Sequence, residues 1–229
     1  MNRPLWTLVV LGLAALLGTA AVCAERGQGL DAEDERTVRT VLDSIALLHQ
    51  RLDARKAELQ ARFDKIDLGH YLEPAQLASS SDLQAARGDL VRYRALLTER
   101  DRLNADAAAQ GHALLAGLPQ GGLREAMLRN EARLAEGGRE IRAELLRTQV
   151  ANADAMEAVI DWADRNHALV HLRGDKLAID GRQNLDQFDA LQAHLDATAR
   201  SVQEAADRAQ AAQDEGARAG ADLRQVIAK

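Results

Sequence analysis

The most regular hydrophobic pattern of the chain runs from Asn184 to Lys229. Its apolar and small residues follow each other at alternating steps of three and four: Phe188, Leu191, Leu195, Thr198, Val202, Ala205, Ala209, Ala212, Gly216, Ala219, Leu223 and Val226. This heptad spacing lines one stripe of a long α-helix and is typical of helical bundles and coiled coils. The pattern predicts a shape and names no reaction.

Three earlier stretches predict further helices. The first covers about 31–68 and ends at Gly69, because Val38, Ile45, Leu52, Leu59 and Ile66 are spaced by seven. The others cover about 81–116 and 123–172, and the pattern described above gives a fourth helix over about 184–229. Each is bounded by glycine, proline or capping side chains.

Local signals refine these boundaries. Ser81 and Gln84 form the pattern of a capping box, and Asn184 with Gln187 is placed to cap the last helix. Gly137-Gly138 interrupts the third pattern, which favours a bend and leaves a full break open. Residues 172–183 read as either a plain connection or a small extended flap.

The expected fold is therefore all-α. Four long helices joined by short connections favour an elongated antiparallel four-helix bundle that resembles a coiled coil. We expect residues 25–229 to form this bundle as a single domain.

The first 24 residues have the pattern of a secretory signal peptide. Met1 to Arg3 supply a positive start, 5–17 an uncharged apolar core, and Val22-Cys23-Ala24 a site for cleavage before Glu25. Two alternatives stay open: residues 5–24 retained as a membrane anchor, or Cys23 carrying a lipid. The mature chain is expected in the periplasm, secreted, or anchored with 25–229 outside the cytoplasm.

Composition supports helices and narrows the partners. The 229 residues contain 3 prolines and 3% aromatic residues, and arginine far outnumbers lysine, which hints at a bacterial source. The net charge of −6 becomes slightly more negative once Arg3 leaves with the signal, which argues against nucleic acid as a partner. The one cysteine leaves as well, so no disulfide is expected.

A weak metal-site pattern occurs near the end of the third helix. His167 and His171 are four residues apart and Asp164 lies one turn earlier, so a continuous helix presents them on one face. Two imidazoles and a carboxylate suit zinc or another divalent ion. A solvated helix face is the simpler interpretation, so we predict no metal and no cofactor.

Polar residues interrupt the apolar seams of several helices. Arg55, Thr148, Asn152 and Thr198 stand where apolar side chains are expected, and Arg62 does the same. These residues predict either a polar layer that fixes the register or arginine stems that cover the edge of the seam with their charges in water.

Trp162 marks the densest apolar cluster. With Met156 and Val159 it is expected to pack beneath the run 177–179 and against Phe188, although a groove for a peptide or lipid is an alternative.

No pattern predicts catalysis. The chain lacks a G-x-S-x-G serine, a glycine-rich phosphate loop and an H-E-x-x-H pair. We therefore expect a non-catalytic bacterial envelope protein that acts through protein–protein contacts on a long helical bundle. The alternatives are a periplasmic holdase-type chaperone and a binder of a small ligand or metal in the bundle. The envelope partners and a homo-oligomeric state stay open.

Overall fold

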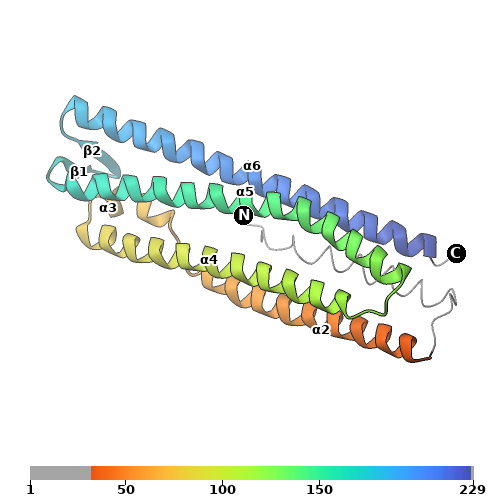
Figure 1. Cartoon of the computed structure of the whole chain (residues 1–229). Coiled ribbons are helices and arrows are strands. Elements are labelled where there is room, and N and C mark those ends of the chain that lie inside the picture. The colour runs from red at the N-terminus through yellow and green to blue at the C-terminus, as the bar shows by residue number, and fades with distance from the viewer. Residues whose placement is uncertain (1–31, 228–229) are drawn as a thin grey trace. The chain divides into compact units, whose positions relative to one another are not determined.

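The computed structural model describes residues 32–227, with the side chains of 134, 213 and 215–227 excepted. Helices dominate this part of the chain, as the sequence predicts, and the two strands are short (Figure 1). The elements follow in the order α2 (Ala32–Phe63), η1 (His70–Leu72), α3 (Pro74–Leu77), α4 (Ser80–Ala116), α5 (Gly122–Arg165), η2 (His167–Leu169), β1 (Val170–Arg173), β2 (Lys176–Ile179) and α6 (Arg182–Ile227). The predicted signal segment lies outside the described residues.

The contacts divide the chain into two compact units, to which α2, α4, α5 and α6 all contribute. In the described part, unit 1 contains residues 32–58, 100–144 and 206–227. Unit 2 contains residues 59–99 and 145–205.

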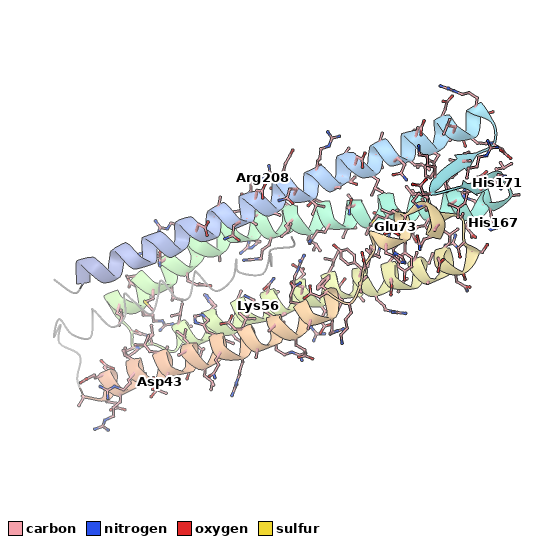
Figure 2. All side chains as sticks on the ribbon, turned by 180° about the vertical axis from the view of Figure 1, so that it is seen from behind. Asp43, Lys56, Glu73, His167, His171 and Arg208 are labelled. Carbon is pink, nitrogen blue, oxygen red and sulfur yellow. The ribbon has the colours of Figure 1, made fainter. Side chains whose placement is uncertain are left out.

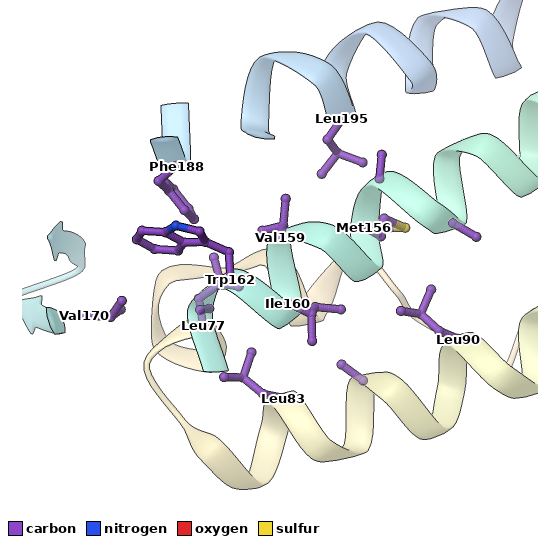
Figure 3. Packing of buried hydrophobic residues seen from close by; sticks show 14 residues of the cluster. Leu77, Leu83, Leu90, Met156, Val159, Ile160, Trp162, Val170, Phe188 and Leu195 are labelled. Carbon is purple, nitrogen blue, oxygen red and sulfur yellow. The ribbon is translucent and has the colours of Figure 1, made fainter. Parts of the chain in front are cut away.

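The core of unit 2 lies between α3, α4, α5, β1 and α6. Figure 3 shows Trp162 beside Phe188, with ring centroids 5.2 Å apart, and Leu77, Leu83 and Ile160 below them. Leu177 and Ile179 pack against the same cluster, so the expected packing of Trp162 with the run 177–179 and Phe188 is confirmed. Burial of these large side chains is the main stabilising contribution in this unit.

Among the described residues of unit 1, two smaller clusters contain buried apolar side chains. The first joins α2 to the end of α4 and the start of α5 through Val38, Val41, Ile45, Leu115, Leu118 and Met127. In the second, Leu52 of α2 contacts Ala107 of α4, with Leu103 packed against them.

Local chemistry sets where α4 begins. The Ser79 hydroxyl accepts a hydrogen bond of 3.4 Å from the Asp82 amide, so Ser79 caps α4 and the expected cap at Ser81 is wrong. Similarly, α6 begins at Arg182, and the Asn184 side chain donates to the Asp180 carbonyl instead of capping from outside the helix.

Two predicted helices end earlier than their apolar patterns suggested. Helix α2 ends at Phe63, and Leu68 packs against the unit 2 core from the following loop. Helix α5 ends at Arg165, where the side-chain amide of Asn166 donates to the Trp162 carbonyl at 2.8 Å. A periodic pattern continues beyond a helix end whenever loop residues also reach the core. Helix α5 passes through Gly137-Gly138 without a break.

The segment after α5 forms a hairpin, which is the extended flap of the two alternatives. Strands β1 and β2 pair antiparallel, with Val170 opposite Ile179 and Arg173 opposite Lys176. Gly174 and Asp175 form the two-residue loop, and Gly174 has a φ of +67°. A positive φ at the first loop position alone is the pattern of a type II′ turn, where glycine is strongly favoured.

Candidate functional site

The predicted metal residues are not brought together. Because α5 ends at Arg165, His167 lies in η2 and His171 on β1, as Figure 2 shows, and they share no helical face. Asp164 accepts a hydrogen bond of 2.8 Å from Arg87, and His171 Nε2 lies 3.0 Å from an oxygen of Asp180. Within the described residues no group of three or more His, Cys, Asp or Glu side chains could hold a metal ion.

Asp164 belongs instead to a ladder of ion pairs between α4 and α5 in unit 2. Arg87 donates to Asp161 at 2.7 Å and to Asp164 at 2.8 Å. One heptad further along α4, Arg94 donates to Asp154 at 2.6 Å and to Glu157 at 2.7 Å. The hydrogen bonds that the two arginines donate to these carboxylates raise the pKa of both arginines. Each guanidinium group joins two carboxylates one turn apart, which fixes the register of the two helices.

The residues considered for a polar layer have three different kinds of hydrogen-bond partner. Thr198 donates to Asn152 at 3.1 Å, so these two lie together in unit 2. Thr148 donates within its own helix to the Leu145 carbonyl. The Arg55 side chain is 56% exposed and pairs with Glu58 at 2.6 Å, so its charge lies at the surface.

The polar groups that are buried in α2 are His49 and Lys56, which the sequence analysis did not single out. Their residues are 9% and 5% exposed, respectively. They fall on the stripe Val38, Leu42, Ile45, His49, Leu52, Lys56, Leu59 and Phe63, all of which are buried or half-buried. The alternating steps of four and three were the signal that could have found them.

Neither His49 Nε2 nor Lys56 Nζ has a hydrogen-bond partner within the described residues. Burial is the main cause that lowers the pKa of Lys56 to about 8, and the charge of Arg142 lowers it further. Burial also lowers the pKa of His49, against the opposing effect of Asp53. Figure 2 marks Lys56 on α2.

Arg142 of α5 adds a third basic group to this part of unit 1. It is half-buried, and burial lowers its pKa, with Asp101 opposing the change. Its guanidinium group folds back over Gly138, where an added Cβ would lie 3.1 Å from Arg142 Nη1. We call His49, Lys56 and Arg142 the basic cluster.

The basic cluster can donate hydrogen bonds to an anion. A catalytic acid–base pair needs a carboxylate or imidazole with access to a substrate. Here the carboxylates gathered on α5 by the fold are held by Arg87 and Arg94 instead.

Several large apolar side chains in the described part of the chain are exposed, three on helices and one on a strand. Val91 of α4 is 65% exposed, Leu47 of α2 45%, and Val150 of α5 and Leu172 of β1 are also exposed. Across residues 32–227, none of the helices combines the length and apolar character that crossing a membrane requires.

No model of a known family matches the sequence, and no curated protein or solved structure matches it.

Proposed function

We propose that the chain is an exported bacterial envelope protein that acts through protein–protein contacts on its helices, without catalysis. The observation that carries this proposal is the ion-pair ladder. Its four carboxylates, Asp154, Glu157, Asp161 and Asp164, are each bound to an arginine of α4. Such pairs engage the carboxylates and stiffen two helices, which suits a rigid surface for binding and does not suit proton transfer.

We further propose that α2, α4, α5 and α6 pack as an antiparallel four-helix bundle. Contacts in unit 2 support this arrangement. From Arg87 to Arg94 the sequence rises by one heptad on α4, while the carboxylate partners on α5 fall by one heptad, from Asp161 to Asp154. The contacts of Trp162 with Phe188 and of Asn152 with Thr198 give the same antiparallel sense for α5 and α6.

Export is supported by the sequence of residues 1–24. Expression in a bacterial host, followed by fractionation and determination of the mature N-terminus, tests it. We expect to find the chain in the periplasmic fraction, with Glu25 as its first residue. Full-length chain in the cytoplasm would contradict export.

Surface contacts with a partner are proposed to involve the exposed apolar residues Val91 and Leu47. Single exposed apolar residues are common on proteins, so the proposal needs a direct test. A photo-crosslinking amino acid at Val91 or at Leu47, in intact cells, is expected to give a discrete adduct that mass spectrometry identifies. The control carries the crosslinker at the exposed Asp189 of α6. Absence of adducts at both apolar positions, or the same adducts from Asp189, would contradict the proposal.

A holdase-type chaperone is the second candidate, and the same exposed apolar side chains favour it. A holdase suppresses the aggregation of an unfolded outer-membrane protein, whereas a protein with one specific partner does not. Light scattering during dilution of such a client from urea separates the two. Suppression that is lost in a Val91→Ser, Leu47→Ser variant would favour the chaperone.

A further inference from the structure

Two members of the basic cluster, His49 and Lys56, are polar side chains buried at positions where a helical core normally has apolar ones. Leu42, Ile45, Leu52 and Leu59 continue the apolar stripe of α2 on both sides of His49 and Lys56. Burying a polar group is unfavourable unless it is hydrogen-bonded, and burying a charge is more unfavourable unless it is paired. Lys56 Nζ and His49 Nε2 are buried and have no partner within the described residues.

The carboxylates near the cluster do not neutralise it. Asp53 and Asp101 interact electrostatically with members of the cluster. Both of these carboxylates are exposed, and neither accepts a hydrogen bond from Lys56 Nζ. Lys56 Nζ and His49 Nε2 are therefore closed off from solvent without an acceptor among the described residues, and the charge of Arg142 acts on Lys56 from α5.

We propose that His49, Lys56 and Arg142 form a binding site for the oxyanion group of a small ligand, a carboxylate or a phosphate. Ammonium, imidazole N–H and guanidinium groups all donate to such oxygens, and the charged donors form the strongest of these hydrogen bonds. This site is separate from the exposed apolar residues assigned above to protein contacts.

The burial of the donors selects a small ligand over a macromolecule. The surface of a folded partner does not reach a nitrogen that is closed off from solvent, as Lys56 Nζ is. A small anion reaches it during local opening of the surrounding helices, which binding then opposes. The ligand carries the acceptor that the described residues do not supply.

The test compares anions at constant ionic strength with the full mature chain. Inorganic phosphate and succinate are titrated separately by calorimetry, and thermal unfolding is followed by circular dichroism with sodium chloride as the reference salt. We expect at least one of the two anions to bind and to raise the Tm. Phosphate alone identifies a phosphate ligand, and succinate alone identifies a carboxylate ligand. Failure of both to bind overturns the proposal.

Variants connect the binding to the cluster. Lys56→Met keeps the length of the side chain and removes the charge, and the matched control is Lys65→Met, since Lys65 is exposed in the loop after α2. We expect Lys56→Met to weaken binding at least about tenfold and to lose the rise in Tm, while Lys65→Met binds as the unmodified chain does. Equal binding by Lys56→Met overturns the proposal.

A second pair of variants covers a failure of Lys56→Met to fold. His49→Gln keeps a donor but removes the imidazole, and His194→Gln is its control at an exposed position of α6. Weaker binding in His49→Gln alone supports the site, and equal binding in both variants overturns it.

Discussion

The Thr198 hydroxyl of α6 lies 3.1 Å from Asn152 Oδ1 of α5, and its single proton is shared between that oxygen and the Leu195 carbonyl of its own helix, 2.9 Å away. Both side chains are half-buried in the core region of unit 2, and both stand at positions where the apolar pattern expects an aliphatic residue. The pair therefore connects two helices through a polar contact within an otherwise apolar seam.

We predict a measurable coupling between these two residues. In a double-mutant cycle with Asn152→Ala and Thr198→Ala, the coupling free energy should be about 1 kcal/mol, because each single change removes the same half-buried hydrogen bond. Urea unfolding followed by circular dichroism measures it. Thr148 is the control, since its hydroxyl bonds only to the Leu145 carbonyl of its own helix. A cycle of Asn152→Ala with Thr148→Ala should give a coupling near zero, and equal couplings in the two cycles would argue against the pair.

The ion-pair ladder gives a second prediction. Arg94→Met should lower the free energy of unfolding by about 1 kcal/mol, because Arg94 joins Asp154 and Glu157 and is only partly exposed. Arg102→Met on the same helix should change it by less than about 0.5 kcal/mol, because Arg102 is exposed and its nearest carboxylate, on Asp106, lies 3.6 Å away. Urea unfolding at low and high salt checks both. An equal effect of the two changes would show that the ladder does not stabilise the fold.

Two glycines should respond to alanine in opposite directions. Gly137 lies inside α5, and an added Cβ there meets no atom within 4 Å. Gly137→Ala should therefore raise the free energy of unfolding by about 0.5–1 kcal/mol. Gly174→Ala should lower it by about 1 kcal/mol, because the φ of +67° is unfavourable for alanine. Thermal unfolding of both variants measures the two signs, and a loss of stability in Gly137→Ala would contradict a continuous α5.

The lowered pKa of Lys56 predicts how the stability of the chain changes with pH. Its pKa is about 8 in the folded chain and 10.5 as the ordinary value, so the unfolded chain binds more protons between these values. Stability should rise with pH across this range, by up to about 3 kcal/mol from this group, and the cost of burying the charge is fully present below pH 8. The difference in unfolding free energy between the unmodified chain and Lys56→Met isolates this contribution. A difference that does not change with pH would contradict it.

Helix content was the most predictable part of the structure. From Phe188 to Ala212, every heptad position of the last helix is buried or half-buried, as the spacing predicts. The helix ends were less predictable, because Leu68 contributes to the unit 2 core from a loop and so extends the apolar pattern beyond Phe63. Residues 172–183 read equally well as a connection or a flap, since a short apolar run does not reveal its strand partner.

The basic cluster was missed for a specific geometric reason. From Leu52, a step of three leads to Arg55 and a step of four leads to Lys56, and a helix with 3.6 residues per turn permits either. In the structure Arg55 lies toward solvent with Glu58, while Lys56 takes the buried position. The following turn repeats the choice, because Arg62 pairs with Glu99 and Phe63 packs against Tyr93. Only the packing of the helices decides between neighbouring residues.

The central proposal is that this chain works by binding. Its ladder carboxylates form ion pairs between α4 and α5, and the side chain of Lys56, unpaired among the described residues, lies on the buried face of α2. Direct titration of the Lys56 side chain by NMR, with isotope-labelled lysine in a chloride buffer free of phosphate and carboxylates, tests it most directly, and Lys56→Met assigns the signal. The account predicts a pKa of about 8 for Lys56. A pKa at or above 10.5 would contradict it, because that value requires an exposed amine or an ion pair with a carboxylate.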